Sequence, residues 1–595
     1  MLQDNQKIEI AKGRPMLNWV GKHPINYVKG FPAQLIEVFD PLNLDKVVLN
    51  PRYDELENSW QNLLFHGDNK EVLSSLLELG FRGKIDLIYI DPPFKSGADY
   101  IRKVELRGLK HSDLIEDDDA SILQQTMYFD IWNNDNYLQF MYERFILMKE
   151  LLSETGSIYV HLDWNTGHYV KVLMDEVFGS ENFLSEIVWY RYNKIPDRTK
   201  NTYFKMHDTI LLYAKNRGLH YFNQVLSPTG KKVKRRKMKK INGKIANLEE
   251  YTEYVQEMLL TRSVIDFIPD VNIGSSNEKV GFETQKPEKL IELFVSASSK
   301  VGDIVLDCFL GSGTTAVVAQ KLGRRWIGCD INKGAIQLAS FRLQKTIKEQ
   351  INNEEKANYF PIFSIYKVND YDLRILNTEA IELTVQHIGI QRTKTDRFFD
   401  GTLGKKLVKI IDFNHPLSLL DLQILQDELK NRPNEERDIT IVCLGKEYAV
   451  DAWIDEWNKK HPVNKIDIIE LRTDKRYGGF LIHQPDEAKV KIERKGHKAI
   501  IEIEDFIAPT IIERLNAESN IWKVKIPDFR SMIDCVLVDN NFDGQKFRIV
   551  FSDIPEKKND LIKGKYEIDI PKEKTKIAVK IIDMLGEEIL IVQEV

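Results

Sequence analysis

Apolar and polar positions along the first 350 residues form a pattern of strands that alternate with helices. The short strand Leu63–Phe65 leads into a helix over Glu71–Leu79, which Gly80 ends. The run Ile85–Ile90 is almost continuously apolar, as expected of a strand buried on both faces. Similar segments follow, with helices over Tyr137–Leu152 and Gly167–Phe178 and strands over Ser157–Leu162 and Phe183–Tyr190. This alternation predicts a parallel α/β sheet.

A second α/β pattern follows a region without sheet periodicity. The strand Ile304–Asp307, a helix ending at Leu322 and the strand Trp326–Asp330 extend the first sheet, whereas a smaller α/β unit begins after about residue 350. The last 115 positions alternate apolar and charged residues with period two, which predicts a small β sandwich. The expected divisions are an N-terminal arm (1–60), a catalytic half (61–190), an insertion (191–279), a cofactor half (280–350), a small α/β domain (351–480) and a β-rich domain (481–595).

Composition excludes several classes of protein. The 595 residues are 43% hydrophobic and 29% charged, and no apolar run has the ~20 residues of a membrane helix. The polar N-terminus lacks a signal-peptide core, so we expect a cytoplasmic protein. Four cysteines without zinc-ligand spacing give no metal site. The net charge of −6 excludes a uniformly basic nucleic-acid binder but permits a local basic surface.

The tetrad Asp91-Pro92-Pro93-Phe94 ends the apolar strand Ile85–Ile90. Two prolines fix the backbone and leave carbonyl groups free to accept hydrogen bonds. Asp91 and the Pro92 carbonyl can accept from an exocyclic amino group, and Phe94 can stack on its ring. The tetrad alone is equally compatible with a strand end followed by a proline turn.

A glycine loop, Asp307-Cys308-Phe309-Leu310-Gly311-Ser312-Gly313, separates a strand from a helix. Asp330 ends the next strand, 17 positions after Gly313. Glycines allow close approach of the backbone, the helix N-terminus offers N–H groups, and the acid can bind ribose hydroxyls, so a nucleoside-bearing cofactor is predicted. The glycines alone would equally suit a nicotinamide or flavin dinucleotide. Asp68, which follows the strand Leu63–Phe65, can touch a ligand or simply cap the next helix.

These motifs together resemble those of S-adenosylmethionine-dependent DNA amino-methyltransferases. The tetrad precedes the glycine loop by over 200 residues, as in the permuted beta class of that family. Thr284–Pro287 is similar to a second cofactor-binding element, His66–Asp68 to the strand before the tetrad, and Trp189 with His207–Tyr213 to a strand pair behind the catalytic pocket. Within the family, the sequence resembles the modification subunits of type III restriction-modification systems and related defence-associated adenine methylases.

The resemblance implies a Rossmann-like methyltransferase sheet in permuted order, with an inserted target-recognition region and C-terminal α/β and β-rich domains. It implies transfer of a methyl group to N6 of a flipped-out adenine in double-stranded DNA, since serine often replaces Asp91 in cytosine-N4 enzymes. The implied catalytic residues are Asp91, Pro92, Pro93 and Phe94. The implied cofactor-binding residues are Asp68, Lys286, Asp307, Phe309, Gly311, Gly313, Thr314 and Asp330.

A basic cluster lies in the insertion, with nine positive charges and no acid between Thr229 and Ile245. Such a cluster favours contact with DNA phosphates over a merely solvated loop. The expected DNA-binding residues are Lys231, Lys232, Lys234, Arg235, Arg236, Lys237, Lys239 and Lys240. The expected partners are double-stranded DNA, a second copy of the chain and a separate helicase-nuclease restriction subunit.

Further expectations concern one loop and the activities that compete with adenine methylation. The polar segment Ser96–Gln125 is predicted to be a loop. Pro485-Asp486 with Glu493-Arg494-Lys495 mimics the acid-acid-lysine set of Mg²⁺-dependent nucleases, although the surrounding alternation of lysine and glutamate argues against a nuclease. The sequence is also compatible with a cytosine-N4 or RNA methyltransferase, and with a DNA-recognition subunit whose methylation is weak or conditional.

Overall fold

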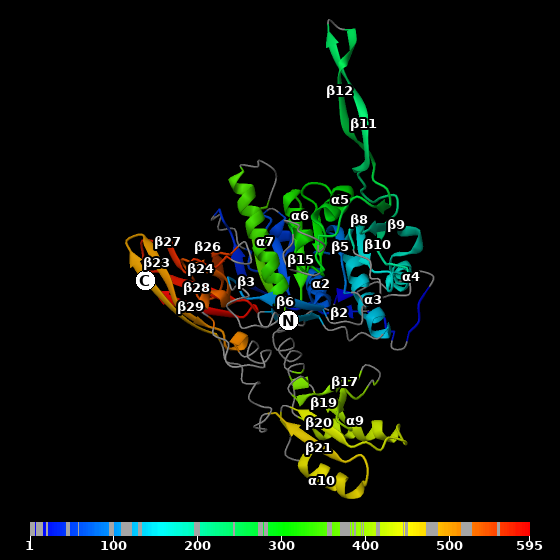
Figure 1. The fold of residues 1–595 in the computed structure, drawn as a ribbon, viewed down its shortest axis with the longest axis vertical. Coiled ribbons are helices and arrows are strands. Elements are labelled where there is room, and N and C mark those ends of the chain that lie inside the picture. Colours follow the sequence, from blue (N-terminus) through cyan, green and yellow to red (C-terminus); the bar gives the residue numbers. More distant parts are fainter. Residues whose placement is uncertain are drawn as a thin grey trace. The chain divides into compact units, whose positions relative to one another are not determined.

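An 11-stranded, mostly parallel sheet organises the larger of two units in the computed structural model (Figure 1). The larger unit joins residues 1–369 to 486–595, and the smaller unit comprises residues 370–485. The structure describes residues 6–7, 16–19, 22–25, 27–42, 48–57, 59–93, 100–108, 122–128, 134–194, 203–241, 244–271, 278, 284–353, 360–368, 381, 384–385, 388–393, 396, 398–411, 417–443, 445–446, 450–471, 486–512, 526, 528–555 and 560–595. Within these ranges, no helix has both the length and the apolarity to cross a membrane.

Adjacent parallel strands form the centre of this sheet, as the alternating pattern predicts. Their spatial order is β8 (Leu152–Leu162), β5 (Ile85–Ile90), β14 (Ile304–Asp307), β15 (Arg325–Asp330), β4 (Asn62–His66) and β16 (Phe363–Val368). The predicted parallel α/β sheet is confirmed. Strand β16 was missed, because it lies in the region that the sequence assigned to the smaller domain.

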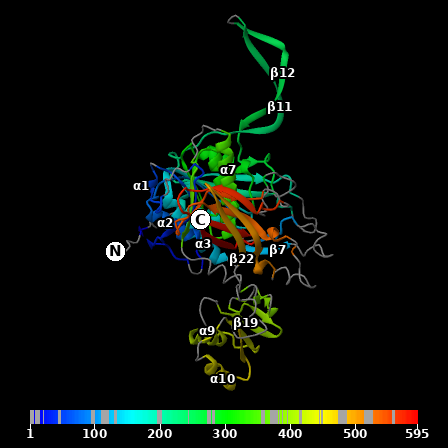
Figure 2. The same ribbon diagram turned by 90° about the vertical axis from the view of Figure 1, so that its left-hand side faces the viewer.

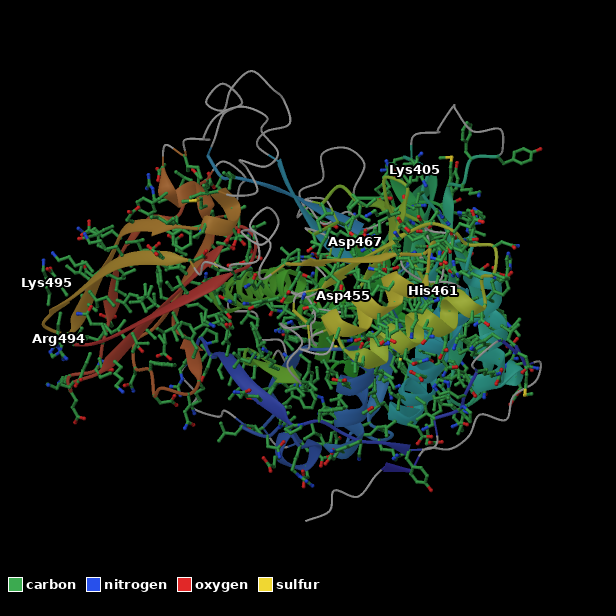
Figure 3. All side chains as sticks on the ribbon, turned by 90° about the horizontal axis from the view of Figure 1, so that it is seen from below. Lys405, Asp455, His461, Asp467, Arg494 and Lys495 are labelled. Carbon is green, nitrogen blue, oxygen red and sulfur yellow. The ribbon has the colours of Figure 1, made fainter. Side chains whose placement is uncertain are left out.

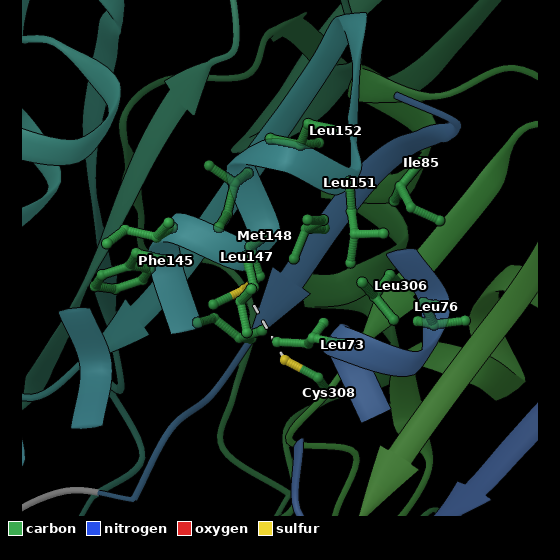
Figure 4. Close-up of a cluster of buried hydrophobic side chains, with 14 of the residues drawn as sticks. Leu73, Leu76, Ile85, Phe145, Leu147, Met148, Leu151, Leu152, Leu306 and Cys308 are labelled. Carbon is green, nitrogen blue, oxygen red and sulfur yellow. Dashed lines mark hydrogen bonds between the residues drawn. The ribbon is translucent and has the colours of Figure 1, made fainter. Parts of the chain in front are cut away.

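Helices cover both faces of the sheet. One face carries α2 (Asn69–Glu78), α3 (Asn134–Leu151) and α4 (Gly167–Phe178), and the other carries α5 (Glu288–Ser298), α6 (Thr314–Lys321) and α7 (Lys333–Asn352). Figure 4 shows part of the first layer, where Leu73 of α2 and Met148 of α3 pack beside Leu306 of β14. Burial of large aliphatic side chains on both faces holds the parallel strand ends in a fixed register.

Segments distant in sequence complete both edges of the sheet. Beyond β8 lie β10 (His207–Ala214), β9 (Phe183–Tyr190) and β13 (Val264–Ile265); beyond β16 lie β3 (Ala33–Phe39) and β25 (Phe547–Ile549). Strands of the predicted arm, insertion and β-rich domain therefore belong to one sheet. Periodicity identified few of them because their pairing partners are nonlocal.

Two antiparallel hairpins each form a separate two-stranded sheet. Strands β11 (Leu226–Ile241) and β12 (Lys244–Leu260) pair with each other (Figures 1 and 2), and β11 contains eight of the nine residues of the basic cluster. Strands β6 (Tyr100–Glu105) and β7 (Ile122–Tyr128) form the second hairpin, so the prediction of a loop over residues 96–125 was wrong for residues 100–105 and 122–125. Their mixed polar sequences hide the strand pattern.

The smaller unit is an α/β fold with a five-stranded sheet. Its strands are β17 (Gln391–Arg392), β18 (Gly401–Leu403), β19 (Lys406–Ile410), β20 (Ile439–Cys443) and β21 (Ile466–Glu470), with helices α9 (Leu419–Lys430) and α10 (Val450–Lys460). Strands β19, β20 and β21 are parallel, and α9 and α10 connect them along the chain.

The C-terminal segment contains two antiparallel sheets around one apolar core. One sheet contains β22 (Glu487–Lys495), β23 (Lys498–Ile507) and β27 (Lys565–Asp569); the other contains β26 (Phe551–Asp553), β24 (Ile533–Asp539), β28 (Lys576–Asp583) and β29 (Glu588–Glu594). The remaining short elements are β1 (Gln6–Lys7), β2 (Tyr27–Val28), α1 (Tyr53–Leu56), η1 (Ser180–Asn182) and η3 (Phe529–Met532).

The nuclease-like residues are not gathered into a site. Asp486 is buried before β22, whereas Glu493 is an exposed side chain seven positions later that pairs with Lys491 at 2.7 Å. Seven residues of strand span about 20 Å, too far for both acids to hold one metal ion. Arg494, labelled with Lys495 in Figure 3, donates to the carbonyls of Pro571 and Lys572 at 2.8 Å. Pro485 lies outside the described residues.

Candidate active site

The carboxyl ends of the parallel strands bring four of the predicted acids to one edge of the sheet. Asp91 follows β5, Asp307 ends β14, Asp330 ends β15 and Asp68 lies two positions after β4. Strands β5 and β14 are neighbours, yet the chain continues from β5 towards β8 and from β14 towards β15. Ligands of open α/β sheets bind at such a switch point.

Asp91 pairs with Lys286, a contact between residues 195 positions apart in the chain. Lys286 Nζ donates to Asp91 Oδ2 and, at 3.3 Å, to the Thr284 carbonyl. Asp91 Oδ1 is also buried, and no described residue hydrogen-bonds to it. Pro92 is buried and Pro93 half-buried beside it. The site therefore presents a carboxylate with one oxygen held by a lysine and one acceptor available to another donor.

Asp307 lies at the end of the neighbouring strand and is fully buried. Its Oδ1 accepts from Phe309 N at 2.9 Å, and its Oδ2 accepts from Thr315 Oγ1 at 2.6 Å. Burial raises the pKa of Asp307 to about 7; the two hydrogen bonds oppose this rise, whereas the charges of Asp91 and Asp330 add to it. A cation placed here would relieve the repulsion between these carboxylates and favour the ionised form of Asp307.

The glycine loop depends on backbone shapes that other residues rarely adopt. Gly311 has φ 52° and Gly313 has φ 80° at the start of α6. A Cβ on Gly313 would lie 2.7 Å from Ala339 Cβ of α7. Asp330 accepts from Gly311 N at 2.8 Å and from Asn332 N at 2.9 Å, so it fastens the loop to the end of β15.

Asp68 caps helix α2, as the simpler interpretation of the sequence expects. Its Oδ1 accepts from Lys70 N at 2.8 Å, and both of its oxygens accept from Arg144 Nη2 at 3.0 Å. Arg144 is buried on α3, where it stacks on Phe140 and also donates to Asn69. The side chain of Asp68 is 28% exposed, which leaves part of its carboxylate accessible.

A buried polar chain that the sequence analysis missed crosses the strands behind the tetrad. Hydrogen bonds join Tyr89 Oη to His161 Nδ1 at 2.9 Å and His161 Nε2 to Asp208 Oδ2 at 3.2 Å, and Arg191 pairs with Asp208 Oδ1 at 3.0 Å. Burial opposes ionisation of Asp208, but His161, Arg191 and Lys286 lower its pKa to about 2. The sequence signal for this hydrogen-bonded network was one ionisable side chain in each of two apolar strands, His161 in β8 and Asp208 in β10.

Several predicted residues contribute less to the observed geometry. Thr314 Oγ1 accepts from Arg342 Nη1 at 3.1 Å and contacts Ser312 Oγ at 3.2 Å. Phe94 and the side chains of the basic cluster lie outside the described residues; for the cluster, the structure gives the main-chain pairing of β11 with β12. In the described part of the chain, no group of three or more His, Cys, Asp or Glu side chains is placed to hold a metal ion.

Comparison with known proteins gives the family. Residues 85–341 match the model of a DNA methylase family. The type II methyltransferase M.HpaI of Haemophilus parainfluenzae is 30% identical over 277 residues, which cover 47% of this chain and 74% of that protein. The type II methyltransferase M.EcaI of Enterobacter cloacae is 26% identical, with 45% and 66% covered. The Mod subunit of the type III restriction-modification enzyme EcoP15I of Escherichia coli is 29% identical, with 36% and 32% covered.

The match to the family model runs from β5 to α7, so it includes both the tetrad and the glycine loop. The chain spans only about a third of the Mod subunit, whereas it covers most of M.HpaI. S-adenosylmethionine is the methyl donor of this family, which modifies amino nitrogens of DNA bases. The chain belongs to the N6/N4 DNA methylase family.

Proposed function

We propose that the chain methylates N6 of adenine in a specific sequence of double-stranded DNA, as the modification subunit of a restriction system. The observation that carries this proposal is the buried Asp91 Oδ1, which has no hydrogen-bond donor among the described residues. An exocyclic amino group would satisfy it. An aspartate at the first position of the tetrad favours adenine over cytosine, and the tetrad-first order supports the permuted beta-class arrangement. Similarity to a type III Mod subunit supports the restriction context and a separate restriction partner.

The target base must leave the duplex to reach the edge of the sheet, at a cost of a few kcal/mol. Asp91 Oδ1 and the Pro92 carbonyl then accept the two amino hydrogens, while Phe94 stacks on the base. Lys286 holds one oxygen of the Asp91 carboxylate, so the side chain is oriented with its other oxygen available as an acceptor. These contacts would direct the nitrogen lone pair towards the methyl group. As the N–C bond formed, the methyl–sulfur bond would break to leave a neutral thioether, and the methylated nitrogen would release one proton to water.

The residues at the end of β14 suit the cofactor. When bound, S-adenosylmethionine supplies an activated methyl group on a positively charged sulfur. Asp307 would face the cationic part of the cofactor, and Gly311 and Gly313 would admit it close to the backbone. Phe309 would contact the apolar surface of the cofactor. Thr314 lies at the N-terminus of α6, whose N–H groups would bind polar groups of the cofactor, and Asp330 would bind its ribose hydroxyls. Asp68 and Lys286 border the same site.

Cofactor affinity should depend on pH because Asp307 has a pKa of about 7 in the ligand-free protein. A cationic ligand favours the ionised carboxylate, so binding below pH 7 must first remove a proton. We expect affinity to fall up to about tenfold for each pH unit below 7 and to level off above it. Titration calorimetry between pH 5.5 and 8.5 measures this profile.

Asp307→Asn should weaken binding at pH 8 and flatten the profile. A matched control is Asp86→Asn, since burial also raises the pKa of Asp86 but its carboxylate accepts from Ile304 N at the start of β14. This control should keep the wild-type pH dependence. A flat wild-type profile would contradict the assignment of Asp307 to the cofactor.

Sequencing of modified bases in plasmid DNA incubated with the protein and S-adenosylmethionine tests the proposal. The expected product is N6-methyladenine within one recurring sequence. N4-methylcytosine, or no modified base, would overturn the adenine assignment. The restriction context is tested separately, by copurification of the chain with the product of a neighbouring helicase-nuclease gene.

A further inference from the structure

Exposed aromatic side chains gather in one part of the larger unit. Among the described residues, eight aromatic side chains are strongly exposed, and six of these lie between positions 164 and 204. We call this set the aromatic rim: Trp164, Tyr169, Tyr190, Tyr192, Tyr203 and Phe204. Their exposure ranges from 39% to 95%, with Tyr203 the most exposed. A concentration of large apolar rings in water indicates a binding surface.

Strand register places the aromatic rim beside Asp91. Ile90, Val160, Leu211 and Glu186 form one row across β5, β8, β10 and β9. Asp91 lies one position beyond this row, whereas Tyr190, the last residue of β9, lies four positions beyond it in the same direction. Trp164 lies in the turn that follows β8, and Tyr203 and Phe204 precede the outer end of β10. At about 3.3 Å per residue and 4.8 Å between strands, the rim begins about 10 Å further out than Asp91 and about 5 to 15 Å to its side.

Cations and fixed loops accompany these rings. Lys205 Nζ lies over the Trp164 ring, and Arg191, between Tyr190 and Tyr192 in sequence, pairs with the buried Asp208. The two ends of the β9–β10 connection, which carry Tyr192, Tyr203 and Phe204, are bound to each other, since Arg191 N donates to the Met206 carbonyl at 2.7 Å and Lys194 Nζ donates to the Lys205 carbonyl at 3.1 Å. The surface is therefore preorganised, with positive charge next to aromatic faces.

We propose that the aromatic rim stacks on the DNA bases that lose their neighbours when the target base is extruded. Rings interleaved with cations bind unpaired bases by stacking, which is tolerant of sequence. A base rotated out of the duplex into the site at Asp91 leaves its former stacking neighbours outside the edge of the sheet, which is the side on which the aromatic rim lies. This inference rests on the proposed function, and it adds a site that would hold the distorted duplex open during methyl transfer.

The test measures binding and needs no methylation. The probe is a 20-nucleotide single strand containing 2-aminopurine, and the fluorescence of this base falls when it stacks. The double variant Tyr203→Ala/Phe204→Ala removes two exposed rings without opening a core. We expect its affinity for the probe to fall at least about tenfold, with loss of the fluorescence quench.

Phe222→Ala is the matched control, because Phe222 is 52% exposed and follows β10 at its opposite end. It should bind the probe like the wild type. Wild-type binding and quenching by the double variant would overturn the proposal, as would equal losses in the double variant and the control. A wild-type protein that binds the probe through these rings but leaves plasmid DNA unmodified would refute the proposed methylation and leave the stacking surface established.

Discussion

Asp91→Ala is expected to lower the rate of methyl transfer by about 10²- to 10⁴-fold, the range found for the loss of a positioned polar group that acts on the reacting atom. The variant loses the acceptor that orients the amino nitrogen, and it leaves Lys286 without its carboxylate partner. Cofactor affinity should change far less, because most residues assigned to the cofactor lie at the ends of β14 and β15 or in the glycine loop that leads into α6. Single-turnover transfer of labelled methyl groups, with calorimetry for the cofactor, separates the two effects.

Asp54→Ala is the matched control for this experiment. Asp54 is 69% exposed on α1 and pairs with Arg52 at the surface. Its removal should leave the rate within about twofold of wild type, since surface substitutions away from special features have small effects. A rate for Asp91→Ala within a few fold of the control would remove the tetrad from the catalytic site.

Neutralising part of the basic cluster should produce the second large effect. Lys232, Lys234 and Arg236 are paired in register with Gln256, Tyr254 and Thr252, none of which is acidic. If each contacts one phosphate, the triple glutamine variant should make the negative slope of log affinity against log salt shallower by about 3, and should lower affinity for duplex DNA at 0.1 M salt by about 10²- to 10³-fold. Fluorescence anisotropy at several salt concentrations measures both quantities.

A control with the same change of charge replaces Lys491, Lys495 and Lys498 by glutamine in the C-terminal hairpin β22–β23. Long-range attraction alone would make the two triple variants equally weak. The phosphate-contact assignment requires that the β11 variant alone lose salt dependence. Equal salt slopes in both variants would mean that the β11–β12 hairpin does not contact DNA.

Local patterns predicted the parts of the fold whose partners are close in sequence. The strand that carries the tetrad, helix α4 and strand β14 have the expected bounds, and the glycine loop lies between its predicted strand and helix. These segments have strong apolar periodicity or residues that only one backbone shape accepts. By contrast, the sequences of strands β3 and β25 have neither of these features, and the position of each strand depends on a pairing partner hundreds of residues away.

In the candidate site too, features set by local sequence were predicted, whereas contacts between distant residues were not. Sequence indicated Asp91, Asp307 and Asp330 because each ends an apolar strand. It assigned Lys286 to the cofactor but gave no sign that Lys286 contacts Asp91, since that pairing depends on how α5 packs against β5. Contacts of this kind are properties of packing between elements, which periodicity along the chain does not encode.

Strand β25 gives the fold a consequence for how the protein can be divided. It pairs with β3, so residues near the C-terminus cover an edge strand supplied by the N-terminal region. A fragment ending at residue 369 would contain every proposed catalytic residue but would expose the unpaired edge of β3, a template for association with other chains. A contiguous fragment is thus a poor choice for isolating the catalytic part. A better fragment keeps both ends of the chain and replaces residues 370–485, the smaller unit, with a linker.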